Sequence, residues 1–185
     1  ISAAATKPFG FMPFYPGPGL GGHCIPIDPF YLSWKAKQFN FEARFIELAG
    51  QVNGSMPEYV VTRVAEALNA HKKPLNGSKV HVLGVAYKRD IDDVRESPAL
   101  DVIELLLRRG ASVTYSDPYV PEIDHGPHQM KAVTLDAAIA AGADCAVIVT
   151  DHKAFDYPSI VAAFPVIVDT RNALKGVKSD KIFGL

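Results

Sequence analysis

Short apolar runs alternate with amphipathic runs over the second half of the chain. Apolar positions are continuous in the first kind of run and recur at three- and four-residue steps in the second. The first kind predicts buried strands and the second predicts helices. Strands are expected at 79–84, 112–116, 145–149 and 166–169, and helices at 99–109, 135–141 and 157–163. Strands that alternate with helices form a parallel sheet covered on both faces, so 75–185 is predicted to be a Rossmann-like α/β domain.

A long helix is predicted before this domain, at 45–71. Pro57 lies inside it and predicts either a kink or a new helix start at Ser55. The apolar stripe of this helix is expected to pack against the same helix of a second copy, or alternatively to cover the chain's own α/β domain. The stripe comprises Met56, Val60, Val64 and Leu68. A shorter helix is expected at 30–37, and 72–77 is the predicted domain boundary.

Glycine, proline and aromatic residues dominate 9–22, ahead of the helices. No regular helix or strand can run through so many prolines and glycines, yet the aromatic content is too high for a flexible linker. We therefore expect an ordered loop that packs against the rest of the chain. The start at Ile1 has neither Met nor a charged leader, which predicts a fragment of a longer protein. The expected organisation is a central helical dimerisation region at 1–73, followed by the α/β domain.

Composition and charge narrow the functional classes. A net charge of −1 provides no basic field for nucleic acid, and the sequence has no apolar run of membrane length. The two cysteines differ in setting, because Cys145 lies within an apolar run that predicts a buried thiol whereas Cys24 follows a glycine-rich run. A structural disulfide is therefore not expected, and a reducing cytoplasm is the predicted compartment.

The glycine-rich run before Cys24 is the candidate site of the first region. Four glycines allow backbone amides to approach a ligand closely, and they present the thiol on an accessible loop. His23 and Asp28 could tune that thiol or orient a water molecule. The alternative is a glycine–proline turn that merely contains a cysteine. One cysteine beside one histidine does not make a zinc site, so no metal is expected.

Four motifs occur in order over nearly the whole chain: GPGLGGHCIPIDP at 17–29, LGVAYKRDIDDVRESP at 83–98, YSDPY at 115–119 and VDTR at 168–171. Together they resemble the UDP-glucose/GDP-mannose dehydrogenase superfamily. The resemblance implies oxidation of the C6 alcohol of a UDP-sugar to a carboxylate in two NAD-dependent steps, through a cysteine-bound thiohemiacetal and thioester. It also implies a homodimer, and an amino-terminal NAD-binding domain with upstream catalytic residues that this sequence lacks.

The resemblance assigns roles in the chemistry to three residues. Cys24 resembles the nucleophile, beside the nicotinamide of NAD, and a thiol is the group that can add to an aldehyde. Asp28 resembles the carboxylate that positions the hydrolytic water, although it could equally be an ordinary residue at a helix start. Arg95 resembles the residue that contacts the NAD pyrophosphate, and an ion pair with a carboxylate of its own loop is the alternative.

Substrate contacts are expected from the glycine-rich loop and from the ends of two strands. A lysine or arginine at the carboxyl end of a strand is well placed to bind a phosphate. Lys88 and Arg171 both follow strands in this way. The alternative for Lys88 is that it forms a solvated charge pair with Arg89. Arg44 is expected to act from the neighbouring subunit. The substrate-binding residues implied by the resemblance are Tyr15, Gly17, Gly19, Gly21, Tyr87, Lys88, Arg171 and Arg44.

The segment FYPGPGLGGHCIPIDPFYL at 14–32 resembles the branch that oxidises UDP-N-acetylhexosamines. This chain has Pro8 where many UDP-glucose dehydrogenases have an arginine, and His23 where the family often has Ser or Tyr. UDP-glucose and GDP-mannose are the alternative substrates. Two alternatives lie outside the enzyme class: a non-catalytic module that binds nucleotide sugars or dimerises, and a redox protein that uses Cys24 as a sensor.

Four further residues are expected to have no role in binding. Asp117 could mimic an acid that binds the ribose of NAD, but the turn at 84–87 lacks the glycine fingerprint, so Asp117 is predicted to form a turn with Pro118. Histidines with no ligand spacing are expected to be solvated loop residues. These histidines are His125, His128 and His152.

Overall fold

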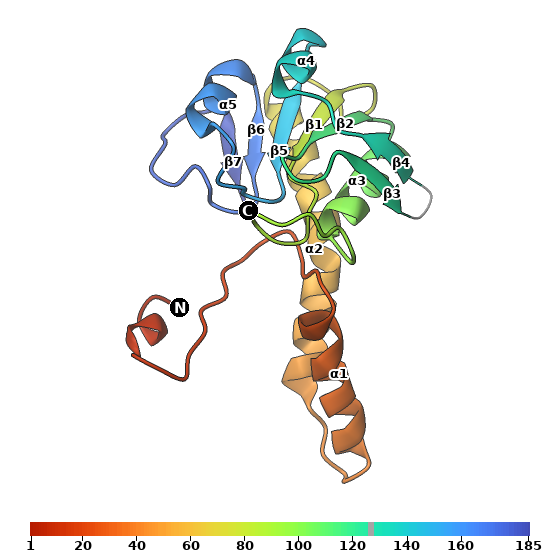
Figure 1. Ribbon diagram of the computed structural model, residues 1–185, viewed down its shortest axis with the longest axis vertical. Coiled ribbons are helices and arrows are strands. Elements are labelled where there is room, and N and C mark those ends of the chain that lie inside the picture. The colour runs from red at the N-terminus through yellow and green to blue at the C-terminus, as the bar shows by residue number, and fades with distance from the viewer. Residues whose placement is uncertain (126–127) are drawn as a thin grey trace.

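The computed structural model describes residues 1–125 and 128–185, and its centre is a five-stranded parallel sheet (Figure 1). In sheet order the strands are β2 (Ser112–Ser116), β1 (Lys79–Leu83), β5 (Cys145–Ile148), β6 (Ile167–Asp169) and β7 (Ile182–Gly184). The predicted α/β fold is therefore confirmed. β1 lies between β2 and β5, so the chain adds its second strand on one side of β1 and the next strand of this sheet on the other side. Sheets of this kind bind ligands at the carboxyl ends of the strands beside such a switch of sides.

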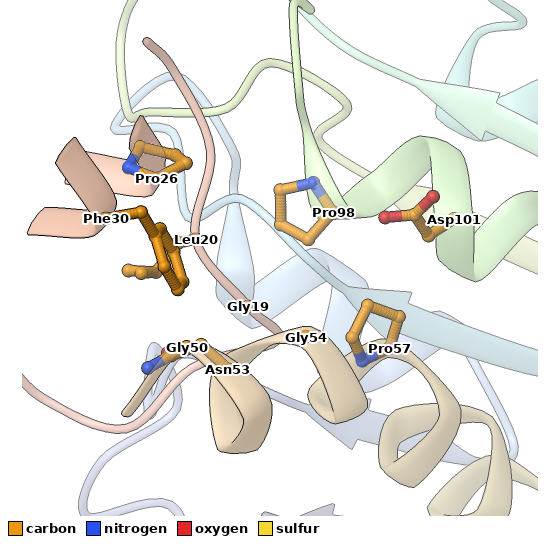
Figure 2. Close-up of a pocket in the computed structure, with 10 residues that line it drawn as sticks. All are labelled: Gly19, Leu20, Pro26, Phe30, Gly50, Asn53, Gly54, Pro57, Pro98 and Asp101. Carbon is orange, nitrogen blue, oxygen red and sulfur yellow. The ribbon is translucent and has the colours of Figure 1, made fainter. Parts of the chain in front are cut away.

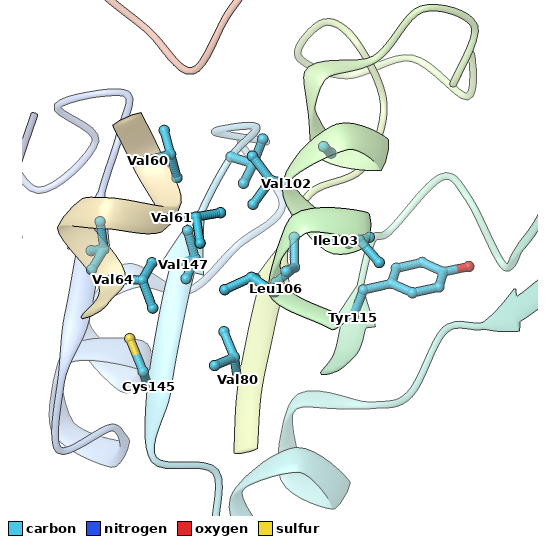
Figure 3. Packing of buried hydrophobic residues seen from close by; sticks show 14 of the residues in the cluster. Val60, Val61, Val64, Val80, Val102, Ile103, Leu106, Tyr115, Cys145 and Val147 are labelled. Carbon is cyan, nitrogen blue, oxygen red and sulfur yellow. The ribbon is translucent and has the colours of Figure 1, made fainter. Parts of the chain in front are cut away.

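Helices cover both faces of the sheet. Successive residues of a strand point to opposite faces, so Cys145 and Val147 join one buried cluster while Ala146 and Ile148 join the other. The first cluster is covered by α2 (Arg44–Ala70) and α3 (Pro98–Arg108), as Figure 3 shows, and the second by α5 (Tyr157–Ala163). The short helix α4 (Leu135–Ala140) precedes β5.

The apolar stripe of α2 covers the chain's own sheet. Val60, Val64 and Leu68 are fully buried in the same cluster as Leu106 of α3 and Val147 of β5 (Figure 3). The prediction that this stripe packs against a second copy is therefore wrong, and its alternative is correct. The physical reason is that a parallel sheet must be covered on both faces, and α3 shares the task on this face with the second half of α2.

The first half of α2 pairs with α1 (Cys24–Lys37) in a helical hairpin that projects away from the sheet (Figure 1). α1 begins at Cys24, six residues earlier than the predicted 30–37. Pro26 lies in its first turn, where backbone amides have no partner within the helix, so this proline does not delay the start. α2 continues through Pro57. None of the described helices is both long and apolar enough to cross a bilayer.

Several short elements were not predicted. They are the 3₁₀ turn η1 (Ala4–Thr6), the antiparallel strands β3 (Glu122–His125) and β4 (His128–Lys131), and the edge strand β7. The side chains of His125 and His128 lie outside the described part of the structure, so the prediction made for them is not addressed.

Candidate active site

The glycine-rich segment packs against residues that follow strands of the α/β domain. A Cβ atom on Gly17 would lie 2.7 Å from Nη1 of Arg171, and one on Gly21 would lie 2.6 Å from Cβ of Tyr87 and 2.8 Å from the carbonyl oxygen of Glu96. At Gly21, where the neighbours are a Cβ atom and a backbone oxygen, only glycine allows so close an approach. The motifs at 17–29, 83–98 and 168–171, which are far apart in sequence, therefore form one continuous surface.

Arg171 lies in a cleft beyond the carboxyl ends of β5 and β6. Its Nε atom donates a hydrogen bond of 2.9 Å to the carbonyl oxygen of Val149, and burial, followed by the nearby charge of Arg89, lowers its pKa. Asp169 fixes the loop that carries Arg171 by accepting hydrogen bonds from the amides of Arg171, Ala173 and Leu174. A cationic side chain is thus held in a defined place before any ligand arrives.

The cleft around Arg171 has a volume of about 880 Å³. Tyr15 lines it from the glycine-rich segment, and Arg89 and Lys175 add positive charge. Arg89 forms an ion pair with Asp151, which also lines the cleft. Lys88, the predicted phosphate contact, is exposed and does not line the cleft. The role predicted for Lys88 stays a prediction, and Arg89, the next residue on the same loop, is the one that lines the cleft.

Cys24 is exposed and is the first residue of α1, directly after the segment that packs against Tyr87. The accessible thiol is confirmed, but it stands at a helix start and not within a loop. Cys145 is fully buried in β5 as predicted, and burial raises the pKa of its thiol. Asp28 lies four residues after Cys24 on α1, so both side chains share a face of the helix.

Arg95 forms the ion pair that was its alternative role. Its Nε and Nη2 atoms donate to both carboxylate oxygens of Asp93 at 2.7 to 3.2 Å. These bonds lower the pKa of Asp93 to about 2. The Arg95 side chain is nevertheless 58% exposed, so it remains accessible to a ligand. Its carbonyl oxygen accepts a hydrogen bond of 3.3 Å from the amide of Gly22, which joins its loop to the glycine-rich segment.

Arg44 does not approach the cleft within this chain. It begins α2 at the far tip of the hairpin (Figure 1), where it is paired with Glu42. The base of the hairpin meets the α/β domain at a small cavity of about 160 Å³ (Figure 2). Phe30 of α1 lies over Gly50 of α2 on one side of it, and Gly19 lies against Pro98 at the start of α3. This cavity is far smaller than the cleft around Arg171.

His152 is not a solvated loop residue, and that prediction is wrong. Its side chain is completely buried, and its Nε2 atom lies 2.9 Å from Oδ2 of Asp117. Asp117 does form the predicted turn, since it accepts hydrogen bonds from the amides of Tyr119 and Val120. The sequence pattern missed His152 because its partners, Asp117 and the amide of Asp90, lie in loops that follow other strands. Within the described residues, no three His, Cys, Asp or Glu side chains gather as a metal site would require.

Comparison with known proteins agrees with this arrangement. Residues 1–55 match the central domain of the UDP-glucose/GDP-mannose dehydrogenase family, and residues 81–176 match its UDP binding domain. The chain is 38% identical over 168 residues to a UDP-N-acetyl-D-mannosamine dehydrogenase of Methanococcus maripaludis, covering 86% of this chain and 36% of that protein. It is 32% identical over 160 residues to an NDP-N-acetyl-D-galactosaminuronic acid dehydrogenase of Ralstonia nicotianae, covering 84% of this chain and 36% of that protein.

A solved structure extends the likeness to three dimensions. The UDP-D-ManNAc dehydrogenase of Pyrococcus horikoshii superposes with a TM-score of 0.80 at 33% identity, covering all of this chain and 42% of that one. The chain thus spans a little over a third of the length of these relatives, and the resemblance to the UDP-N-acetylhexosamine branch is confirmed. With both domain matches and these identities, the chain belongs to the UDP-glucose/GDP-mannose dehydrogenase family.

Proposed function

We propose that this chain is the part of an NAD-dependent UDP-sugar 6-dehydrogenase that binds the UDP end of the substrate and supplies the nucleophile, Cys24. The observation that supports it most is the packing of Gly17 against Arg171, because it joins the segment that leads to the thiol to a cationic cleft. The similar proteins named for N-acetylated sugars support a UDP-N-acetylhexosamine as the substrate class.

The cleft suits a diphosphate. Arginine presents a planar set of N–H donors that matches phosphate oxygens, and Arg171 and Arg89 both face this space. Arg171 is held by the carbonyl oxygen of Val149, so little conformational entropy is lost when it binds. The sugar would then extend along the glycine-rich segment toward the start of α1.

Cys24 would act once the C6 alcohol has become an aldehyde. Its sulfur adds to the aldehyde carbon and forms a thiohemiacetal, whose oxidation yields a thioester. Asp28, one turn further along α1, would orient the water that hydrolyses the thioester and releases the carboxylate. The start of α1 favours the negative charge that develops on oxygen in these steps.

The α/β domain itself does not fit NAD. Its first strand is followed by Gly84-Val85-Ala86-Tyr87, which lacks the glycine fingerprint, and the carboxylate of Asp117 is fully engaged by hydrogen bonds within the chain. Bound NAD would supply the hydride acceptor for the two oxidations. Arg95 is the residue of this chain that we propose contacts its pyrophosphate, from the surface beside Gly22.

UDP alone tests the proposal on this chain. We expect saturable binding in isothermal titration calorimetry, and an affinity at least about tenfold lower for Arg171→Gln, because a charge-assisted contact contributes roughly 1.5–3 kcal/mol. Arg108→Gln, on the exposed end of α3, should bind UDP as the unchanged chain does. No saturable binding at millimolar UDP, or equal affinities for all three proteins, would contradict the proposed function.

We also propose a homodimer formed through the α1–α2 hairpin. The hairpin leaves a set of large apolar side chains partly or largely exposed: Phe30, Tyr31, Leu32 and Trp34 on α1, and Phe45, Leu48 and Val52 on α2. Phe30, Tyr31 and Trp34 line one shallow apolar depression on α1, and exposed apolar surface of this kind favours association. It replaces the buried stripe of α2 as the candidate dimer surface.

Sedimentation velocity at micromolar concentration should therefore show a dimer. Trp34→Glu is expected to produce a folded monomer, because a charge would have to be buried at the interface. Ile139→Glu, a matched change on α4 at an exposed apolar position outside the hairpin, should leave the dimer intact. A monomer for the unchanged chain, or a dimer that tolerates Trp34→Glu, would exclude this surface.

A further inference from the structure

We infer that Asp117 and His152 are positioning residues that hold both ends of the loop at 85–90 and thereby place its nucleotide-contacting side chains. Neither residue faces the cleft, and neither was expected to take part in binding. The inference rests on the proposed function, since it concerns how that same site is kept ready for UDP. It is carried by one connected set of buried hydrogen bonds.

Asp117 holds the first end of the loop. Its side chain is completely buried at the end of β2, and Oδ2 accepts hydrogen bonds from the amides of Val85 at 2.7 Å and Ala86 at 3.1 Å. Its other oxygen accepts from the amides of Tyr119 at 2.8 Å and Val120 at 3.2 Å. One carboxylate therefore joins the segment after β1 to the segment after β2.

His152 holds the second end. Its Nδ1 atom accepts a hydrogen bond of 2.9 Å from the amide of Asp90. The ring proton must then be on Nε2, which donates to Oδ2 of Asp117 at 2.9 Å. The ring is held between Tyr119 and Phe155, with centroids 5.0 and 5.6 Å away. The orientation of the imidazole is thus determined on all sides.

Between these two anchors lie the side chains that reach the site. Tyr87 packs against the glycine-rich segment at Gly21, Arg89 lines the cleft, and Lys88 is exposed between them. A further bond steadies the same loop, because Oγ1 of Thr150 donates to the carbonyl oxygen of Ala86 at 2.6 Å. Side chains on a short loop with both ends fixed can sample few positions, so less order has to be created when a ligand binds.

Because Asp117 is charged, loss of any of these hydrogen bonds would destabilise the loop. Burial alone would raise its pKa, but the hydrogen bonds from His152 and from the backbone amides outweigh burial, and the pKa is lowered. The carboxylate is therefore ionised at neutral pH, and the loop amides take the place of its water of hydration. Removing one donor would leave a buried negative charge incompletely solvated, and the loop would rearrange.

His152→Phe tests the inference on the whole 185-residue chain. Phenylalanine keeps a ring between Tyr119 and Phe155 but removes both hydrogen bonds. We expect the dissociation constant for UDP to rise at least about tenfold, and amide hydrogen exchange at Val85, Ala86 and Asp90 to quicken while exchange in β6 is unchanged. His152→Gln retains an N–H group that can reach Asp117, so its dissociation constant for UDP should lie between those of the unchanged chain and of His152→Phe. It also serves as the test if the phenylalanine variant does not fold.

His81→Phe is the matched control. His81 is a second fully buried histidine, hydrogen-bonded to Thr114 and Ser116 and stacked on Phe164, and none of these partners belongs to the loop. The same substitution there should lower the melting temperature but leave UDP affinity unchanged. If both variants weaken UDP binding in proportion to lost stability, the role of His152 is merely structural and the inference is wrong.

The outcomes separate this inference from the proposed function. UDP binding by the unchanged chain together with equal affinity for His152→Phe would overturn the inference alone. Absence of UDP binding by the unchanged chain would contradict the proposed function, and the inference would then be tested by hydrogen exchange alone. Unaltered exchange at the amides of Val85, Ala86 and Asp90 in His152→Phe would overturn the inference.

Discussion

Cys24→Ala, in the dehydrogenase of which we propose this chain is a part, is expected to lower sugar oxidation by about 10³-fold or more, because no other group near the start of α1 can form the thioester. The measurement is the absorbance of reduced NAD with a UDP-N-acetylhexosamine as the substrate. UDP binding should be unchanged, since Arg171 and Arg89 are untouched. Activity above about a tenth of the original would exclude the thiol mechanism.

Cys145→Ala is the control for this experiment. Cys145 is fully buried in β5 and cannot reach a substrate, so only stability should change. The chain itself allows a direct check of the contrast between the two thiols. Iodoacetamide should modify Cys24 and spare Cys145 under native conditions, because one thiol is exposed and burial raises the pKa of the other. Equal modification of both would contradict the described burial.

Gly84→Ala is expected to destabilise the fold by more than about 3 kcal/mol. Gly84 directly follows β1 with φ of +80°, which already disfavours alanine by roughly 1–2 kcal/mol. In addition, a Cβ atom there would overlap the backbone oxygen of Thr150 and lie 2.7 Å from its Cβ. The backbone of a central strand cannot yield easily, so β1 and β5 would have to separate at their carboxyl ends.

Gly142→Ala separates the two causes. Gly142 has a similar φ of +71°, but a Cβ atom there would meet nothing within 4 Å. Gly142→Ala should therefore lower the free energy of unfolding only by the cost of the backbone conformation, roughly 1–2 kcal/mol. The measurement is the free energy of unfolding in urea for the three proteins. Similar losses for both variants would show that the close approach to Thr150 is not what requires glycine at position 84.

Much of the fold and part of the candidate site could be predicted from the pattern of residues. The strands β1, β2, β5 and β6 and the helices α2 to α5 lie within a few residues of their predicted ranges. The burial of Cys145 and the exposure of Cys24 were predicted correctly, because both follow from neighbours in sequence. Local pattern determines these features because strand and helix periods, turns and caps involve residues close together in the chain.

Long-range contacts explain what the pattern missed. The stripe on α2 has the same spacing whether it faces a second copy or the chain's own sheet, and only the assembled sheet shows that it covers β5 and β6. His152 looked like a solvated residue because its hydrogen-bond partners, Asp117 and the amide of Asp90, are distant in sequence. The choice of Arg89 over Lys88 as the cleft residue depends on how the loop at 85–90 is anchored.

The sequence by itself thus determined the order of the strands β1, β2, β5 and β6 and of the helices between them, the family motifs and the accessible thiol. The tertiary structure alone decided which surfaces meet: Gly17 with Arg171, Gly21 with Tyr87, and Asp117 with His152. The periodicity of apolar positions and the turn residues indicate how each segment folds locally. The partner of a buried polar or apolar side chain depends on which strands and helices the sheet brings together, and that information is spread over the whole chain.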